Sequence, residues 1–184
     1  MKSGVIWLLV ALAAMWIVEL INGVMGHQLN NWGILPRTTH GLTGIPLMPF
    51  LHGNLGHLLS NTIPFLILGG LVALRGQRVF LSISLFIIVV GGGGVWAVGR
   101  TSFHVGASGL VFGYFGYLVA RGWYDRKLKS ILTAVVVLVL YGGLIFGVLP
   151  TQTFVSWEAH LFGMIAGVLI ARLAIVKTPP TPSS

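Results

Sequence analysis

The chain has 184 residues, of which 55% are hydrophobic and only 8% are charged, whereas soluble domains carry roughly 25% charged residues. This composition excludes a water-soluble globular domain. The chain contains no cysteine, which also excludes disulfides, iron–sulfur clusters, thiolate zinc sites and a cysteine nucleophile.

Six apolar stretches predict membrane-spanning helices, which makes this an all-α, polytopic membrane protein. The first, about 4–22, follows Lys2 and contains Ala-Leu-Ala at 11–13, features shared with secretory signal peptides. We prefer a membrane span because the apolar run continues through Val18, beyond what a signal core requires. Runs such as 133–149 do not alternate apolar and polar residues, which excludes a membrane β-barrel. The other predicted spans are about 57–74, 79–99, 107–121, 130–149 and 155–176.

The connections between these spans indicate a single domain, 1–176. Residues 22–56 form one long connection that is rich in Gly, Pro, Asn and His. A connection of this length in a compact domain usually has a function, and we expect it to lie folded at the outer face of the membrane. Residues 177–184 form a proline-rich tail that is expected to be disordered and cytoplasmic.

The basic residues predict the orientation in the membrane. With six spans both termini lie on one side, and nine basic residues fall on that side: Lys2, Arg75, Arg78, Arg121, Arg126, Lys127, Lys129, Arg172 and Lys177. Only Arg37 and Arg100 fall on the opposite side. Because cytoplasmic loops are enriched in Lys and Arg, the termini are predicted to be cytoplasmic. The net charge of +8 therefore reflects topology, and no nucleic-acid partner is expected.

Strongly polar residues recur at one depth inside the predicted spans. A helix rises 1.5 Å per residue, so Ser108, His160 and Asn61 lie roughly 20, 18 and 21 Å from the cytoplasmic basic residue of their own helix. This depth is about 10 Å below the outer face of a hydrocarbon core that is roughly 30 Å thick. His57 and Asn61 are four residues apart, so they share a helix face and can point at one spot.

Small residues flank the predicted serine and histidine. Gly109 and Gly113 on one span, and Gly163 and Gly167 on another, are each spaced four apart, which allows two helices to approach closely. A hydrogen bond between Ser108 and a histidine requires such an approach. Each feature alone has an ordinary structural explanation, because membrane serines often bond their own helix and GxxxG faces often only pack. Their convergence at one depth favours a functional site.

Three motifs, taken together, resemble the rhomboid family of intramembrane serine proteases. They are HGNLGHLLSN at 52–61, GASG at 106–109 and AHLFGMIAG at 159–167, and the resemblance covers residues 5–175. It implies a bundle of six transmembrane helices and transmembrane proteins as substrates in the lipid bilayer. It also implies no cofactor. A bacterial member would lie in the cytoplasmic (inner) membrane with its active site open to the outer side.

The resemblance also implies roles for individual residues. Ser108 would be the nucleophile and His160 the general base. His57, Asn61 and the Ser108 backbone N–H would form the oxyanion hole. Supporting positions would be His52, Gly106, Gly109, Phe112, Gly163 and Gly167.

Two positions depart from the family pattern. Phe112 stands where many members have an aromatic hydroxyl four residues after the serine, so ring stacking on His160 is available but a phenol is not. Trp32 and Arg37 are separated, where many relatives carry an adjacent Trp-Arg pair in the outer loop.

Histidines and acidic residues suggest other sites, which we consider weaker. All six histidines fall on the outer half, but there is no HExxH motif and no nearby set of carboxylates, so no metal site is expected. Glu158 is two residues from His160 and points about 200° away from it on a helix, which favours a dyad without an acid. Glu19, late in the first span, is expected to have a capping or interfacial role.

We therefore expect an intramembrane serine endopeptidase that cleaves membrane proteins near the outer face. One alternative is a catalytically inactive rhomboid-like binding protein, which would lack a dyad residue. Another is a small six-helix transporter, which would show interrupted helices or charges along a path. The sequence does not specify an oligomeric state.

Overall fold

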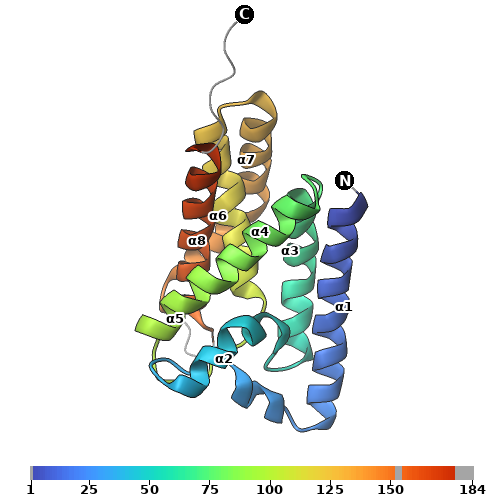
Figure 1. Cartoon of the computed structure of the whole chain (residues 1–184), viewed down its shortest axis with the longest axis vertical. Helices are drawn as coiled ribbons and strands as arrows, with labels where there is room; N and C mark the ends of the chain where they lie inside the picture. The colour runs from blue at the N-terminus through green and yellow to red at the C-terminus, as the bar shows by residue number, and fades with distance from the viewer. Residues whose placement is uncertain (1, 152–154, 177–184) are drawn as a thin grey trace, which may run out of the picture.

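The structure, a computed structural model, describes residues 2–151 and 155–176 and consists mostly of helices that run along one long axis (Figure 1). Within these residues no strand occurs, and an isolated antiparallel bridge joins Ile34 to His104. The predicted all-α fold is therefore confirmed. The predicted tail, 177–184, lies outside the described residues.

Five helical stretches are long and apolar enough to cross a membrane: Ser3–Val24, Leu55–Ala73, Gln77–Val98, Leu128–Val148 and Trp157–Ala174. The elements that form them are α1 (Lys2–Val24), α3 (Leu55–Ala73), α4 (Gln77–Phe86), η3 (Ile87–Gly91), α5 (Gly92–Val98), α7 (Leu128–Tyr141), η4 (Gly142–Val148) and α8 (Trp157–Val176). The segment η3 is one π-helical turn that joins α4 to α5. The five stretches start and end close to the ranges predicted from sequence, within the usual uncertainty of helix ends.

The predicted span 107–121 corresponds to α6 (Ser108–Asp125), the central helix of the molecule. It has 18 residues, so it is roughly 27 Å long, close to the thickness of a hydrocarbon core. It packs against α3, α7 and α8, and most of its side chains are buried. Because α6 is not among the five strongly apolar stretches of the described chain, the count of six spans remains a prediction.

Large apolar side chains cover the outside of the bundle. Val139 on α7 is 78% exposed, and Val136, Leu140 and Leu20 are also exposed. Soluble proteins rarely expose continuous apolar surface of this extent. The surface therefore suits contact with lipid chains.

The α6 and α8 helices approach as closely as the glycine spacing predicts. A Cβ added to Gly163 would collide with the backbone of Gly109, and one added to Gly167 would collide with the carbonyl of Gly113. Any larger residue on α8 at these two positions would push the helices apart. The contact brings the first turn of α6 beside the first turns of α8.

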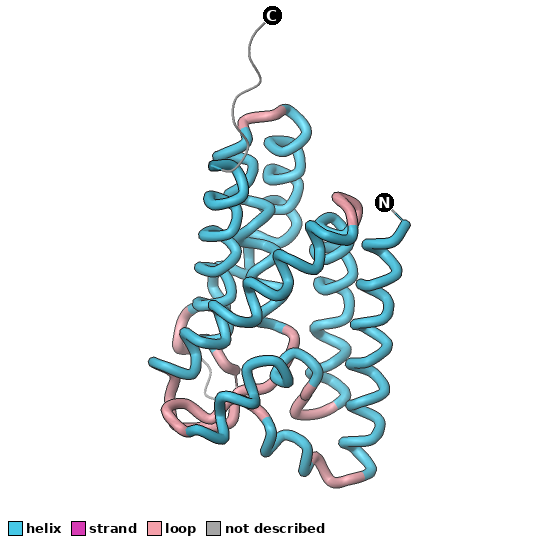
Figure 2. Tube along the Cα trace, viewed as in Figure 1, coloured by secondary structure: helices cyan, strands magenta, loops and turns pink. Residues whose placement is uncertain are grey.

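The long connection 22–56 is folded rather than extended, and it lies across one end of the bundle (Figure 2). It contains η1 (Gln28–Trp32), α2 (Thr39–Leu47) and η2 (Met48–Phe50). Arg37 anchors it to the α5–α6 loop by donating to the Gly99 carbonyl at 2.7 Å and the Thr101 hydroxyl at 3.1 Å. Trp32 instead lies against His40, with 5.3 Å between ring centroids. The separated Trp and Arg thus make separate contacts.

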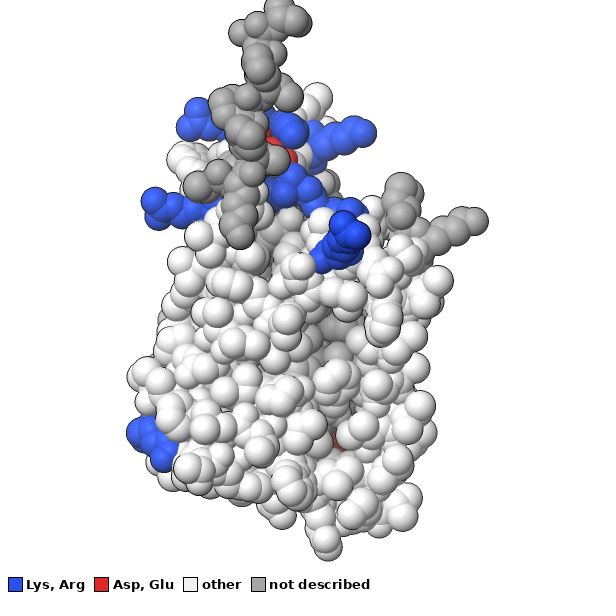
Figure 3. Space-filling view, in the orientation of Figure 1, with Lys and Arg blue, Asp and Glu red and all other residues white. Residues whose placement is uncertain are grey.

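Most of the Lys and Arg residues gather at the other end of the bundle, which we call the basic end (Figure 3). It carries Arg75 in the α3–α4 connection, Arg78 in the first turn of α4, and Arg126 and Lys127 in the α6–α7 connection. The face shown in Figure 3 has little charge between its two ends. The prediction that the termini are cytoplasmic rests on this concentration of basic residues at one end of the bundle.

Candidate active site

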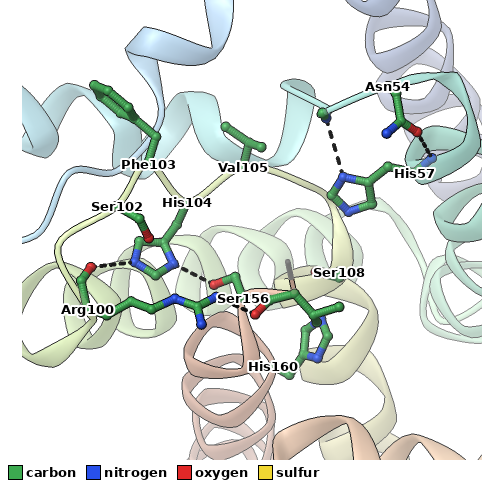
Figure 4. A pocket seen from close by; sticks show the side chains of 12 residues that line it. Asn54, His57, Arg100, Ser102, Phe103, His104, Val105, Ser108, Ser156 and His160 are labelled. Carbon is green, nitrogen blue, oxygen red and sulfur yellow. Dashed lines mark hydrogen bonds between the residues drawn. The ribbon is translucent and has the colours of Figure 1, made fainter. Parts of the chain in front are cut away.

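A cavity of about 450 Å³ lies at the end of the bundle opposite the basic end. It is bordered by the start of α3, the α5–α6 loop, the start of α6 and the start of α8 (Figure 4). Ser108, His160 and His57, which come from three different helices, all line it. The structure therefore brings these three predicted site residues to one cavity.

Ser108 is the first residue of α6 and is 9% exposed. A sharp bend precedes it, because Gly106 has φ +119°, a conformation that other residues rarely adopt. The Gly106 N–H donates to the Met48 carbonyl at 2.9 Å, and a Cβ on Gly106 would come within 2.7 Å of the His57 ring. Glycine is therefore needed both for the bend and for the space occupied by His57. The positive end of the α6 dipole falls at Ser108.

His160 on α8 is held in a defined orientation and tautomer. Its Nδ1 is 2.8 Å from the carbonyl oxygen of Gly147 in η4. A carbonyl can only accept, so Nδ1 carries the hydrogen of the neutral ring and Nε2 keeps its lone pair. The ring of Phe112 is stacked on the imidazole, with 4.0 Å between centroids and 6° between planes. A neutral histidine in this state can accept a proton at Nε2.

His57 and Asn61 share a helix face, as predicted, but only one of them reaches the cavity. His57 lines the cavity, whereas Asn61 does not and is buried one helical turn further along α3. The Asn61 Nδ2 donates to the His57 backbone carbonyl at 3.0 Å. One hydrogen of this amide is thus used within the helix, and the second remains available.

His52 supports the turn that carries the serine. It is fully buried, its Nε2 accepts from the Ala107 N–H at 3.4 Å, and its ring stands edge-on to His57 with 5.2 Å between centroids. Burial, together with the nearby His57, lowers the pKa of His52 to about 4, so the ring is neutral at physiological pH. Its carbonyl accepts from the side chains of Asn30 at 3.0 Å and Asn22 at 3.5 Å.

His104 and Ser156 form a second polar group on the cavity wall. His104 Nε2 is 3.1 Å from the Arg100 carbonyl and must donate to it, so Nδ1 accepts from the Ser156 hydroxyl at 2.6 Å. The Ser156 oxygen also accepts from the Ala159 N–H at 3.3 Å, as a helix N-cap does. These bonds attach the α5–α6 loop to the start of α8.

The two acidic residues of this half are bound elsewhere. Glu158 accepts from the Arg100 N–H at 3.2 Å and forms an ion pair with the Arg100 guanidinium at 3.5 Å, so it faces the α5–α6 loop. Glu19 is buried on α1 and lies 3.2 Å from His27 Nε2. Neither carboxylate hydrogen-bonds to His160 in the described residues. The Gly147 carbonyl occupies the place at Nδ1 where an acidic third member would act.

Sequence reasoning missed three parts of this site: the Gly147 carbonyl, the Asn22 and Asn30 amides, and the His104–Ser156 bond. Gly147 acts through its backbone, which its residue type does not reveal. Asn22 falls at the end of the first span, and a strongly polar residue at the end of an apolar run was the signal available in the sequence.

Comparisons with known proteins find one matching family model and several similar proteins. The family model of the rhomboid domain matches residues 39–177. An uncharacterized protein of Mycobacterium tuberculosis is 40% identical over 175 residues, which cover 90% of this chain and 73% of that protein. RHOMBOID-like protein 4 of Arabidopsis thaliana is 32% identical over 136 residues, covering 70% of this chain and 33% of that protein. A protein of Bacillus subtilis named as a candidate rhomboid protease is 28% identical over 180 residues, covering 95% of this chain and 85% of that protein.

Proposed function

Because the chain belongs to the rhomboid family of multi-pass membrane proteins, we propose that it is a serine endopeptidase that cleaves other membrane proteins within or near their transmembrane segments. The observation that carries this proposal is the pairing of two features in one cavity. Ser108 lies there at a helix start, and His160 lies there with Nδ1 bonded to the Gly147 carbonyl, which leaves Nε2 as a base.

The proposed reaction is acyl transfer through a dyad. His160 Nε2 takes the proton of the Ser108 hydroxyl as the serine oxygen attacks the scissile carbonyl carbon. The C–N bond then breaks, and His160 returns the proton to the leaving amine. Water next attacks the acyl-enzyme while His160 takes a proton from it; the bond between the acyl carbon and the Ser108 oxygen then breaks, His160 returns the proton to that oxygen, and the new carboxylic acid leaves.

The negative oxygen of the tetrahedral intermediates needs hydrogen-bond donors. The Ser108 backbone N–H is one candidate, because the first N–H groups of a helix have no partner within the helix. The His57 ring is a second, since it lines the cavity beside Gly106. Asn61, which does not line the cavity itself, is a third through the second hydrogen of its amide.

The proposed orientation of the site rests on the distribution of charge. We place the basic end and both termini in the cytoplasm of a bacterial cell, with the Ser108 cavity open to the outer side. Cleavage is then expected near the outer end of a substrate helix. The substrate helix must unwind there, so Gly, Ser or Pro near the cut should speed cleavage, and replacing them with Leu and Ala should slow it.

A serine-directed probe tests the proposal directly. A fluorophosphonate should label Ser108 of the purified protein, and Ser108→Ala should abolish labelling. Labelling should also require His160, because an unactivated serine hydroxyl is a poor nucleophile. Ser102→Ala is the matched control, because Ser102 lines the same cavity and has no assigned role.

Turnover of a tagged transmembrane substrate completes the test. We expect the parent and Ser102→Ala to cleave the substrate. Ser108→Ala and His160→Ala should not cleave it. Labelling that survives His160→Ala would contradict the dyad. Absence of both labelling and cleavage in the parent would favour the inactive binding relative.

A further inference from the structure

A second polar cavity, of about 420 Å³, lies at the basic end of the bundle. It is formed by the start of α4, the end of α6 and the end of α8, with the α3–α4 and α6–α7 connections at its mouth. Four basic side chains line it: Arg75, Arg78, Arg121 and Lys127. Figure 3 shows Lys and Arg gathered at this end. The cavity has no place in the proposed reaction, because Arg121 in its wall lies roughly 20 Å along α6 from Ser108.

The positive charge in this cavity exceeds the negative charge. Asp125 is the one acidic residue that lines it, and the chain has only two other acidic side chains, Glu19 and Glu158, which are bound at the opposite half. Four basic groups against one carboxylate leave an excess of three positive charges (4 − 1 = 3). A cavity with this balance favours an anion.

The single carboxylate is already satisfied. Asp125 Oδ2 accepts from Arg121 Nη2 at 2.8 Å and from the Ser130 hydroxyl at 2.7 Å, and its Oδ1 lies 3.7 Å from Lys127 Nζ. Arg75 and Arg78, in contrast, form no ion pair and no side-chain hydrogen bond within 2–151 and 155–176. As far as the described part of the chain is concerned, their guanidinium groups can therefore bind a ligand.

The surroundings of Arg75 point the same way. The side chain of Arg75 is exposed, but partial desolvation lowers its pKa; the Tyr117 hydroxyl and Asp125 act in the opposite direction, and the like charge of Arg121 lowers it further. An anion between Arg75 and Arg121 would offset the repulsion between them. The hydroxyls of Ser82 and Tyr117 also line the cavity and offer two further donors.

The rest of the wall is apolar and continues along the helices toward the middle of the bundle. Val79 and Ile83 are four residues apart on α4, and Ile170 and Ala174 are four apart on α8, so each pair presents one helix face. A ligand that suits this wall has a hydrocarbon part below its charged group. A free inorganic anion would leave the apolar wall without a partner.

We propose that this cavity binds the phosphate group of an anionic phospholipid, with an acyl chain lying against α4 and α8. Guanidinium groups match phosphate oxygens with pairs of parallel hydrogen bonds, and basic pockets between membrane helices on the cytoplasmic side suit anionic headgroups. The phosphate lies between Arg75, Arg78 and Arg121. The lipid thereby joins the ends of α4, α6 and α8.

Native mass spectrometry of the full chain in detergent tests this assignment. Phosphatidylglycerol and phosphatidylcholine are titrated separately. We expect one saturable phosphatidylglycerol adduct, with a dissociation constant about tenfold lower than that of phosphatidylcholine. The double variant Arg75→Gln/Arg78→Gln should weaken that adduct by about tenfold. Lys129→Gln is the matched control, because Lys129 is exposed at the same end and does not line the cavity. It should bind phosphatidylglycerol as the parent does.

Competition and melting measurements distinguish a lipid phosphate from a soluble phosphate. If inorganic phosphate or glycerol phosphate displaces the lipid and raises the melting temperature equally well, the site takes a soluble phosphate and the lipid assignment is wrong. Equal binding of the two lipids, or equal losses in the double variant and in Lys129→Gln, would overturn the proposal. Circular dichroism checks folding, and Arg78→Gln alone, an exposed position, carries the test if the double variant does not fold.

Discussion

The ring of Phe112 lies flat on the imidazole of His160, with 4.0 Å between centroids and 6° between planes. The Gly147 carbonyl binds the edge of the same imidazole at 2.8 Å. One contact restricts tilt of the ring and the other restricts its rotation, so the proposed base is held without a carboxylate. The stack also fills, with an apolar ring, the position where many relatives have a phenol.

Gly147→Ala tests this support. A Cβ at Gly147 would come within 2.7 Å of Phe112 Cζ, which forces the stacked ring to shift. Misplacing a catalytic group by about an ångström can cost on the order of 10²-fold in rate, and we expect a loss of that size in kcat. Gly143→Ala is the control, because nothing lies within 4 Å of a Cβ there in the same helix. Equal cleavage rates for the two variants would show that the stack is not needed.

Gly106→Ala tests the bend before the serine. Gly106 has φ +119° and Gly76 has φ +114°, but only the Cβ at Gly106 would meet a side chain, that of His57. Each substitution should cost about 1–3 kcal/mol of stability from backbone strain. Only Gly106→Ala should also lose probe labelling and turnover at a temperature where both variants are folded. If Gly76→Ala loses the same activity, strain rather than the position of His57 is responsible.

The proposed oxyanion donors should contribute unequally to the cleavage rate. Removing one donor costs on the order of 10²-fold to 10³-fold in rate, and His57→Ala should fall in that range because His57 lines the cavity. Asn61→Ala should lose less, since one of its amide hydrogens already binds the His57 carbonyl. Ser60→Ala removes another bond to that carbonyl, at 2.8 Å, and should cleave at the parental rate. Steady-state kinetics and melting temperatures separate these effects, and a larger loss in Asn61→Ala would reverse the assignment.

Stability should fall on acidification because His52 is buried as the neutral ring. Its pKa is about 4 when folded, against 6.5 ordinarily, so the unfolded chain binds more protons between these values. The folded state keeps its full stability above pH 6.5 and loses up to about 3 kcal/mol as pH falls toward 4. Burial also lowers the pKa of His104, which adds to the loss.

Melting temperatures of His52→Gln measure this contribution. The glutamine oxygen can still accept from the Ala107 N–H, but it does not titrate, so the drop between about pH 7 and pH 5 should be smaller than in the parent. His40→Gln, at an exposed histidine, should keep the parental drop. Identical drops in all three proteins would show that His52 does not contribute.

Much of the helical fold was predictable because its signals lie in side-chain hydrophobicity. Long apolar runs located α1, α3, α7 and α8, and the glycine spacing correctly predicted how α6 and α8 approach. The folded form of 22–56 was expected, but its contacts were not. Arg37, for example, binds the Gly99 carbonyl, a backbone group that any residue at that position would offer.

The candidate site was predictable to a similar extent and for similar reasons. Depth along each helix brought Ser108 and His160 together, because helix rise is constant. The same counting assigned His57 and Asn61 to one spot, yet Asn61 bonds its own helix, a choice that shared helix face does not determine. The Gly147 carbonyl depends on a 3₁₀-helical end of α7, and the apolar sequence there is equally compatible with a continued α-helix.

The π-helical turn η3 has a consequence for single-residue insertions and deletions in this chain. Such a turn holds one residue more than the α-helical turn it replaces, and each residue of an α-helix rotates the chain by about 100°. Deleting one residue within Ile87–Gly91 would therefore leave a regular α-helical turn and keep the rotational phase of α5. Deleting one residue from the α-helical turns of α4 would instead rotate α5 by about 100°, so Gly99 would lose its register with Arg37, and Arg100 with Glu158. The extra residue in η3 can be lost, whereas the residue count of the α-helical turns beside it couples this membrane helix to the cavity at its end.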